Sequence, residues 1–317
     1  MKTPATHPFG EHISPWKLLI ITLVSSLLGF QLLGIFLGVI VALPFYDGGL
    51  MDLQYAISDP INNPDIRIPL MIMQGVGSAF GLIFIPWLIY TQFLKLKLNF
   101  NQTKASLNPI MLVFLIVVFF MGVNSVVGEW NQNIKLPAVF SSFEQAIQSM
   151  EENMKVLTEI LTGFSSFGEL VLGLLIIAVI PAIGEELVFR GLVQNHLLRI
   201  TNNIHVAIWV TGFIFGAIHM QFYGLFPRML LGVLFGYLYY YSGKLSYAMI
   251  AHFVNNGVAV VAVYFHNIGK FDFDIESTES LPWYQVLLST GILTILFFTF
   301  VRNVNQPDLN EELDENI

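Results

Sequence analysis

Charged residues are scarce in this sequence. Asp, Glu, Lys and Arg together make up 11% of its 317 residues, whereas an ordinary globular domain carries about 25%. Hydrophobic residues make up 55%, and the mean hydropathy is +0.68. A soluble protein of this size could not cover its surface with so few charges, and a disordered chain is far more polar. The composition therefore excludes both classes and indicates an integral membrane protein.

Cysteine is absent and positive charge is in the minority. Without cysteine the chain can form no disulfide, no thiolate zinc site and no cysteine nucleophile. The formal net charge is −8 and the isoelectric point is near 5.3. Proteins that bind nucleic acid need a basic face, so we expect no nucleic-acid partner.

What the chain has in abundance is long apolar runs. A spanning helix needs about 20 predominantly apolar residues, and these runs lack the alternation of outer-membrane β-strands. Candidate spans lie at residues 17–44, 68–94, 109–128, 168–189, 204–221, 225–241, 245–265 and 283–302. The sequence therefore predicts an all-α, polytopic transmembrane helical bundle of about eight spanning helices, embedded in the lipid bilayer.

The distribution of lysine and arginine predicts the orientation, because these residues collect in cytoplasmic loops. A cytoplasmic N-terminus with eight spans places the larger group inside: Lys2, Lys17, Lys95, Lys97, Lys104, Arg190, Arg199, Lys244 and Arg302. The smaller group then lies outside: Arg67, Lys135, Lys155, Arg228 and Lys270. We therefore expect both termini to be cytoplasmic.

The order of the segments predicts three parts. Residues 1–164 hold three spans and an amphipathic helix at 141–161, residues 165–265 hold the polar-containing core spans, and residues 266–317 hold the last span and an acidic tail. The amphipathic helix is expected to pack on its own bundle, with a membrane-interface location as the alternative. Glycines four apart indicate close helix packing at Gly34/Gly38, Gly77/Gly81 and Gly232/Gly236.

Ionisable residues inside a span are costly and therefore indicate function, and the first such group ends the fourth span. Glu186 and Arg190 are four apart, so they share a helix face and can pair. Glu185 points about 100° away from that face and is not neutralised by the pair. Pro181 and Gly184 could bend the helix and admit water. The alternative is an interfacial helix end with solvated charges.

Two further polar groups lie in the fifth and seventh spans. His219 ends the fifth span, where a lone histidine more often caps a carbonyl. His252 and Asn256 are four apart on the seventh span and face one way, whereas Asn255 faces elsewhere; a hydrogen-bonded pair between helices is the alternative. The remaining histidines fall at loops or span ends and are expected to be ordinary: His7, His12, His196, His205 and His266.

Together the three groups supply what hydrolysis inside a membrane requires. A carboxylate can take a proton from water while an imidazole orients that water, and a second imidazole and a carboxamide can donate to an oxyanion. The sequence contains no Gly-x-Ser-x-Gly nucleophile turn and no His-Glu-x-x-His zinc helix. The pattern thus favours water activated by a carboxylate.

These groups resemble the motifs of the CPBP family of intramembrane proteases, which includes type II CAAX prenyl endopeptidases and the Abi, or bacteriocin self-immunity, proteins. The matching motifs occur in order as Glu185-Glu186-x-x-x-Arg190, Phe215-x-x-x-His219 and His252-x-x-x-Asn256. The resemblance covers about residues 165–260. It implies a site in an intramembrane cavity and a peptide or lipidated protein as substrate.

The resemblance also implies a role for each residue. Glu185 and His219 would activate the water, His252 and Asn256 would hold the oxyanion, and Glu186 and Arg190 would support the site. Zinc is a second possibility, because Glu185, His219 and His252 are types of residue that bind it. The expected location is a bacterial plasma membrane.

Two other functions remain open from the sequence. One is a non-catalytic binding or immunity protein of the same family, and the other is a proton-coupled transporter that uses the same polar residues. The simple topology also places Glu185 near the inner end of its span and His219 near the outer end of the next. For the two to meet, the fourth helix must continue past Arg190 or the fifth must begin deeper.

Overall fold

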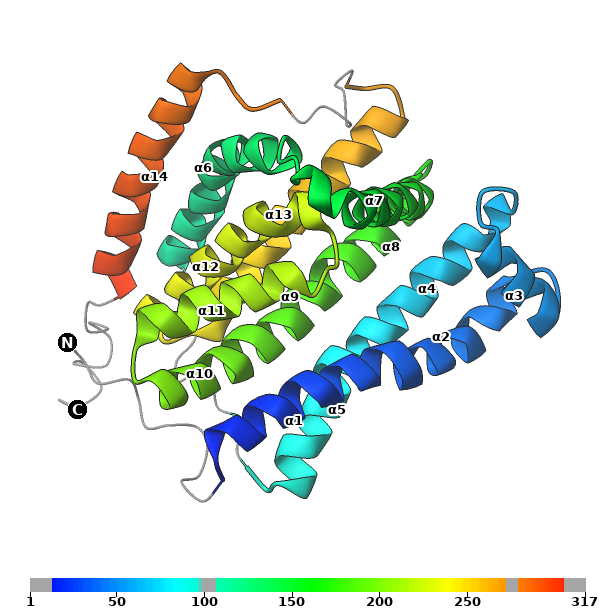
Figure 1. Cartoon of the computed structure of the whole chain (residues 1–317), viewed down its shortest axis with the longest axis horizontal. Coiled ribbons are helices and arrows are strands. Elements are labelled where there is room, and N and C mark those ends of the chain that lie inside the picture. The colour runs from blue at the N-terminus through cyan, green and yellow to red at the C-terminus, as the bar shows by residue number, and fades with distance from the viewer. Residues whose placement is uncertain (1–12, 97, 99–106, 272–278, 305–317) are drawn as a thin grey trace.

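The structure is a computed structural model of the chain, and it describes residues 13–96, 98, 107–271 and 279–304. Every regular element in these ranges is helical. Seven of the described helices are long and apolar enough to cross a membrane, and Figure 1 shows successive long helices running in opposite directions. The prediction of an all-α polytopic bundle is confirmed. Lys2, most of the basic loop 95–104 and nearly all of the acidic tail lie outside the described residues.

The N-terminal part contains three long helices. The first, Pro15–Phe45, includes α1 (Pro15–Leu28) and α2 (Ile35–Ala42). The short helix α3 (Leu50–Ser58) follows, and the second long helix, Pro64–Phe93, includes α4 (Arg67–Ser78) and α5 (Ile85–Leu88). The third is α6 (Leu107–Gln132), and the amphipathic helix α7 (Ser141–Thr162) comes after it.

The remaining helices surround the predicted site. The fourth long helix, Phe167–Thr201, includes α8 (Phe167–Gly173), α9 (Ile180–Glu186) and α10 (Gln194–Thr201). It is followed by α11 (Ile204–Ala217), α12 (Leu225–Ser242), α13 (Leu245–Asn267) and α14 (Trp283–Val304).

Two of the expected span boundaries are wrong, and the errors explain how the site can assemble. The fourth helix does not end at residue 189 but continues to Thr201, so Glu185 lies near its middle. The fifth span is only the 14-residue helix α11, about 21 Å long at 1.5 Å per residue. Because the hydrocarbon core is about 30 Å thick, a helix of this length does not cross it fully, so His219, just beyond α11, can meet Glu185 near the middle of the fourth helix.

Pro86 and Pro181 lie inside long helices, and each follows a π-helical turn. The turn Ala79–Phe84 precedes Pro86, and Leu174–Val179 precedes Pro181. Proline lacks an N–H, and its ring crowds the carbonyl four residues earlier, so a wider turn before it relieves that contact. Pro181 therefore sits in an unbroken helix, one turn before Glu185.

Glycines allow the first and second long helices to pack closely. A Cβ at Gly34 would lie 2.7 Å from the Gly77 Cα, and one at Gly38 would lie 2.9 Å from the Met73 Cα. Real Cβ atoms are not found that close to main-chain atoms, so only glycine fits. The predicted close packing at Gly34 and Gly38 is confirmed.

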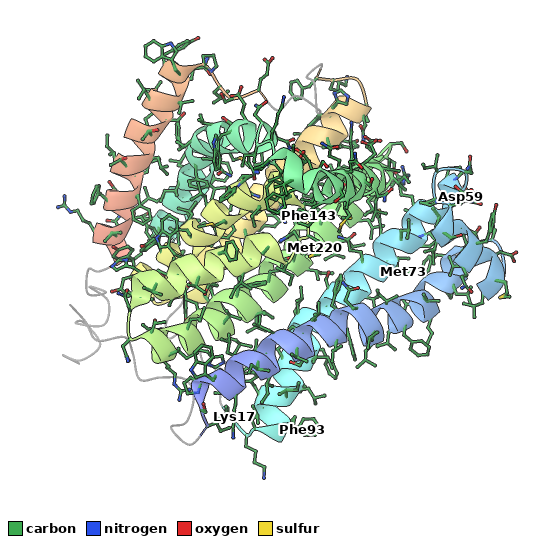
Figure 2. All side chains as sticks on the ribbon, viewed as in Figure 1. Lys17, Asp59, Met73, Phe93, Phe143 and Met220 are labelled. Atoms are coloured by element: carbon green, nitrogen blue, oxygen red, sulfur yellow. The ribbon has the colours of Figure 1, made fainter. Side chains whose placement is uncertain are left out.

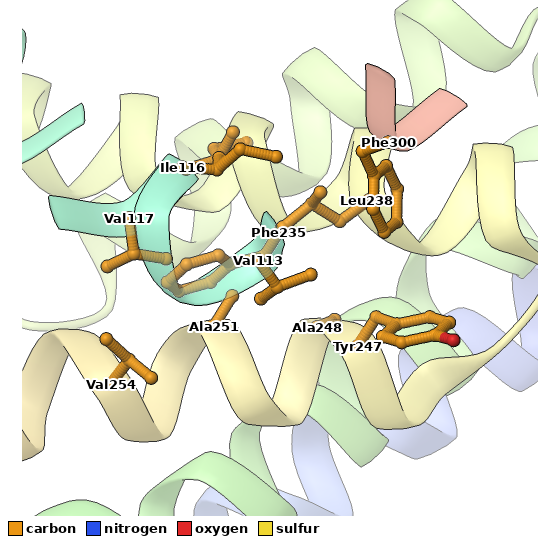
Figure 3. Close-up of a cluster of buried hydrophobic side chains, with 11 residues drawn as sticks. Val113, Ile116, Val117, Phe235, Leu238, Tyr247, Ala248, Ala251, Val254 and Phe300 are labelled. Atoms are coloured by element: carbon orange, nitrogen blue, oxygen red, sulfur yellow. The ribbon is translucent and has the colours of Figure 1, made fainter. Parts of the chain in front are cut away.

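The largest buried apolar cluster joins α6, α12, α13 and α14 (Figure 3). Phe235 from α12 lies between α6 and α13, and Phe300 anchors α14 through an edge-to-face contact with Tyr247 at 5.6 Å. Many large apolar side chains on the outside of the described bundle stay exposed, among them Leu32, Phe36, Leu288 and Phe298. That distribution is expected where lipid, rather than water, surrounds the helices.

Lys17 and Asp59 lie at opposite ends of the bundle. Figure 2 places Lys17 and Phe93 at one end and Asp59 at the other. At the Lys17 end, Leu18 of α1 packs in one cluster with Leu245, which begins α13. Tyr247 of α13 in turn contacts Phe300 of α14, so α1 begins and α14 finishes at the same end of the bundle (Figure 1).

Helix α7 lies on the bundle without a buried residue of its own. It contacts α4, α13 and the turn Phe222–Gly224. Glu151 is the polar link, because its carboxylate accepts a hydrogen bond from the Tyr223 N–H at 3.0 Å. Phe143 and Met150 on α7 remain exposed, and Figure 2 shows Phe143 and Met220 close together in projection.

Candidate active site

A buried ion-pair cluster forms where the fourth helix meets α13. Arg190 Nη1 donates to Glu186 Oε1 at 3.0 Å, as the i, i+4 spacing predicts. His252 Nδ1 donates to the same oxygen at 2.7 Å. All three side chains are essentially inaccessible to solvent. Charges this deep persist only when they are paired, so the cluster fixes the spacing of the two helices.

Arg190 also reaches a third helix. Its Nη2 donates to the Gly232 carbonyl of α12 at 2.9 Å, and its guanidinium carbon lies 4.6 Å from the centre of the Phe215 ring. A Cβ at Gly232 would lie 2.9 Å from the Gly212 Cα and 3.2 Å from Arg190 Nη2. Glycine at 232 therefore lets α11 and α12 approach each other and lets the arginine reach the main chain.

Glu185 differs from its neighbour in burial and in partners. Its side chain is 19% exposed, whereas that of Glu186 is fully buried. Within the described residues its one ion-pair contact is with His252, whose Nε2 lies 3.9 Å from Glu185 Oε2. That distance is too long for a direct hydrogen bond, but a bridging water can span it. Glu185 is thus the accessible carboxylate of the cluster.

His219 lies at the open end of α11 with one nitrogen occupied. Its Nδ1 is 2.8 Å from the Phe215 carbonyl oxygen, and because a carbonyl can only accept, Nδ1 carries the hydrogen. In the neutral imidazole the other nitrogen, Nε2, is then an acceptor. Glu185 and His252 are both near enough to His219 to interact with it electrostatically. The tautomer of His219 therefore suits a group that accepts a hydrogen bond from water.

His252 lies between two carboxylates. Glu186 is paired with Arg190, so its carboxylate accepts the Nδ1–H of His252. Nε2 then faces Glu185 and carries a proton to donate only when the ring is an imidazolium. A carboxylate that orients a histidine in this way occurs in hydrolytic triads.

Asn256 is placed apart from these groups. Its Nδ2 donates to the Ile177 carbonyl at 3.0 Å, and its Oδ1 accepts from Asn255 Nδ2 at 3.1 Å. Ile177 lies four residues before Pro181. Its carbonyl would accept the helical hydrogen bond that Pro181 cannot donate, because proline has no N–H. Asn256 therefore supports the proline-containing turn of the fourth helix, two helical turns before Glu185.

The segment after His219 is braced from two other helices, which the sequence did not reveal. Asn131 of α6 is fully buried; its Nδ2 donates to the Phe222 carbonyl at 3.0 Å and its Oδ1 accepts from the Phe226 N–H at 3.0 Å. Glu151 of α7 accepts from the Tyr223 N–H. The sequence offered no clear signal for Asn131, because it lies beyond the predicted span 109–128 and among other polar residues.

His196, which was expected to be an ordinary histidine outside the site, lies near the end of the fourth long helix. It is fully buried, and its Nε2 lies 2.6 Å from Tyr90 Oη. Tyr90 Oη in turn lies 2.5 Å from Thr22 Oγ1. This polar contact joins α1, the end of the second long helix and α10, far along the fourth helix from Glu185.

The arrangement does not fit the zinc site considered above. No group of three or more His, Asp or Glu side chains within the described ranges gathers closely enough to hold a metal ion. Nδ1 of His252 is engaged by Glu186 and Nδ1 of His219 by a carbonyl, which leaves the Nε2 atoms of both rings to face this region. Glu185, His219 and His252 thus surround a common region without forming a ligand set.

These features define a polytopic helical membrane protein with a polar cluster among its spans. Residues 167–258 match the family model described as "Type II CAAX prenyl endopeptidase Rce1-like". They therefore form an Rce1-like region, which confirms the resemblance drawn from the motifs. The match begins at the first residue of the fourth helix and includes all six predicted site residues.

Two bacterial relatives are similar to parts of this chain. An uncharacterized protein of Mycoplasma capricolum is 27% identical over 220 residues, which is 68% of this chain and 62% of the relative. The uncharacterized protein YpbD of Bacillus subtilis is 26% identical over 112 residues, which is 33% of this chain and 54% of the relative. The chain thus spans less than two thirds of the length of either relative. No solved structure matches.

Proposed function

We propose that the protein is an intramembrane endopeptidase that hydrolyses peptide bonds of membrane-associated polypeptides. The observation that supports this most is the division between the adjacent carboxylates. Glu186 is buried and paired with Arg190, whereas Glu185 is partly exposed and faces two histidines. An accessible carboxylate beside imidazoles in a water-poor setting is suited to general-base chemistry.

In the proposed reaction, Glu185 takes a proton from a water molecule while Nε2 of His219 accepts the second hydrogen bond of that water. The water oxygen adds to the carbonyl carbon of the scissile bond and forms a tetrahedral oxyanion. In its imidazolium form, His252 donates its Nε2–H to the oxyanion. The C–N bond then breaks, and the proton held by Glu185 passes to the departing amine.

Asn256 has a narrower place in this scheme. A carboxamide carries two N–H donors, and one of them is given to Ile177. The resemblance assigns Asn256 to the oxyanion, and its second N–H would donate the hydrogen bond to that oxyanion. Its contact with Ile177 supports an additional positioning role.

The decisive test is proteolysis by the purified protein in detergent, against a panel of peptides and lipidated tails, with and without chelator. We expect cleavage by the wild type and none by Glu185→Gln. Tight binding of a panel member without cleavage would instead favour the binding or immunity alternative. Loss of cleavage with chelator and its return with Zn²⁺ would replace the glutamate mechanism by a metal-dependent one. Substrate-coupled proton uptake into vesicles would favour a transporter.

We further propose that the protein lies in a bacterial plasma membrane with both termini in the cytoplasm. The opposite placement of Lys17 and Asp59 supports this orientation. The chain has no native cysteine, so single cysteines can be labelled cleanly. In intact cells, an impermeant reagent should label Asn62→Cys and leave Lys104→Cys unlabelled; the reverse pattern would invert the topology.

A further inference from the structure

Arg228 is a charge in an unexpected position. The sequence analysis counted it among the outside residues, at the start of the predicted span 225–241; it lies on the first turn of α12, within the candidate span Phe222–Ser242. It is only partly accessible, and it interacts electrostatically with both Glu185 and His219. A cation inside a span is costly and needs a compensating role.

The guanidinium of Arg228 is held by neutral neighbours. Its Nη2 donates to Gln221 Oε1 at 2.6 Å, and it packs over Gly224, where an added Cβ would overlap it. Its Nη1 is buried and has no hydrogen-bond partner within the described residues. Glu151 and Glu185 act on Arg228 electrostatically. Within the described residues, however, no carboxylate oxygen lies within 4.0 Å of an Arg228 nitrogen, the limit for an ion pair.

The support around Arg228 is rigid. Asn131 bridges Phe222 and Phe226, and Asn124 Nδ2 donates to the Pro227 carbonyl at 3.1 Å. The main chain on the N-terminal side of Arg228 is therefore fixed by α6, and its side chain by Gln221. The guanidinium is thus held in place while one of its donors has no partner. A residue that binds substrate is expected to be held in this way.

We propose that Arg228 binds a carboxylate of the polypeptide substrate and so selects substrates with a negative charge near the scissile bond. Arginine binds carboxylates through paired N–H donors, and no group within the described residues accepts the hydrogens of the enclosed Nη1. The inference rests on the proposed peptidase function. The carboxylate can come from the C-terminus of the substrate or from an Asp or Glu side chain.

Position favours this role over direct stabilisation of the oxyanion. The reacting carbonyl must lie about 3 Å from the water that Glu185 activates. Arg228 lies beyond ion-pair distance of Glu185 within the described structure, and His252 Nε2 is nearer at 3.9 Å. Arg228 therefore reaches a group further along the substrate.

The test uses a cleavable peptide from the panel in matched forms: one with a free C-terminal carboxylate, one amidated, and one with its Asp and Glu residues changed to Asn and Gln. Wild-type protein should cleave the peptide that retains the recognised carboxylate with a kcat/KM roughly 10- to 100-fold higher than that for the peptide that lacks it. Arg228→Gln should abolish that preference, mainly through KM, and Arg228→Lys should restore part of it. Arg199→Gln is the matched control and should keep the preference. Arg199 lies on α10 and donates to the Ile13 carbonyl, just before α1.

Gly224→Ala gives a second variant that keeps the charge. Its φ is −113°, so alanine is tolerated by the backbone, but the new methyl group displaces the Arg228 guanidinium. We expect the same loss of preference without loss of thermal stability. Equal cleavage of all peptide forms by the wild type would overturn the proposal, and so would an equal fall in kcat for all forms in Arg228→Gln.

Binding separates this inference from the peptidase proposal. Anisotropy of the labelled peptides with Glu185→Gln protein should show tighter binding of the carboxylate form. If the wild type cleaves nothing but this selectivity is present, the peptidase proposal fails and the carboxylate site stands. If cleavage occurs without selectivity in either assay, only the role of Arg228 is refuted.

Discussion

The N-terminal pair of long helices and the Rce1-like region use glycine for different purposes. In the first pair, Gly34 and Gly38 bring one helix against the main chain of the other. In the Rce1-like region, Gly232 makes room both for the main chain of α11 and for Arg190. Gly236 makes room for the side chain of Gln194, whose Nε2 donates to the Gly236 carbonyl at 3.4 Å.

The difference shows that close packing serves two ends in this membrane protein. Between the first two long helices it maximises apolar contact, the usual source of helix association in lipid. In the Rce1-like region it lets long polar side chains cross between helices and end on carbonyls. A small residue at a helix crossing is therefore a sign of function only when a polar side chain points at it.

The largest expected effect comes from breaking the buried pair. Arg190→Ala leaves Glu186 buried without its cation, a loss of about 3–5 kcal/mol for a buried pair. We expect a clear fall in thermal stability or in yield. The measurement is thermal unfolding of the purified protein in detergent, with Glu185→Gln as the control.

Glu186→Gln should also be destabilised, because it leaves the Arg190 charge without its partner. If Arg190→Ala and Glu186→Gln are as stable as the wild type and yet inactive, the pair acts chemically. The contrast between a structural and a reactive carboxylate would then be wrong.

The next effect concerns the exposed carboxylate. Glu185→Gln keeps the size of the side chain and removes the base, so folding should survive while hydrolysis falls about 10²-fold or more. His219→Ala should cause a similar loss, because both residues handle the same water. Since residues that act as a unit are not additive, the double variant should be little worse than Glu185→Gln. Near-wild-type cleavage by Glu185→Gln would refute the mechanism.

The sequence predicted the helical class, most of the span positions and the pairing of Glu186 with Arg190. These follow from local rules: apolar length sets the spans, and i, i+4 spacing sets the pair. The sequence did not predict how far each helix extends beyond its apolar run. Hydropathy cannot show that the fourth helix runs on to Thr201, because a buried helix end need not be apolar when its polar residues find partners.

Contacts between distant segments were also beyond sequence reasoning. Nothing in the spacing indicates that His252 donates to Glu186, or that Asn256 serves the carbonyl freed by Pro181. Both contacts require the crossing of α13 over the fourth helix, which is a tertiary property. Arg228 was detectable in principle, as a cation in an apolar stretch, but positive charges near span ends are common.

The glycine comparison itself can be tested with Gly34→Ala and Gly232→Ala. Each new Cβ would lie within 3.0 Å of a main-chain Cα, so each should cost roughly 1–3 kcal/mol by overpacking. Only Gly232→Ala also crowds Arg190, so only this variant should lose activity per folded molecule. Unfolding curves and cleavage rates on the same preparations measure both effects, and equal loss of activity in the two variants would remove the distinction.

A smaller effect is expected where Asn256 meets the proline turn. Asn256→Ala removes a hydrogen bond to Ile177, worth about 1 kcal/mol. In a Pro181→Ala background the restored N–H can serve that carbonyl, so the same change should cost less. A double-mutant cycle of thermal stabilities measures the coupling. Identical costs in the two backgrounds would mean that Asn256 does not compensate for the proline.

The smallest expected effect lies where the two regions meet. Tyr90 in the second long helix contacts both Thr22 in α1 and His196 in α10 through its hydroxyl, so Tyr90→Phe removes the polar link and keeps the ring. Polar contacts between membrane helices average about 0.6 kcal/mol, and the change in stability should be of that order. Cleavage should remain, because His196 is more than two helical turns beyond Glu185. A loss of activity at unchanged stability would mean that the N-terminal helices position the reacting groups, and the two regions would then have to be treated as one functional unit.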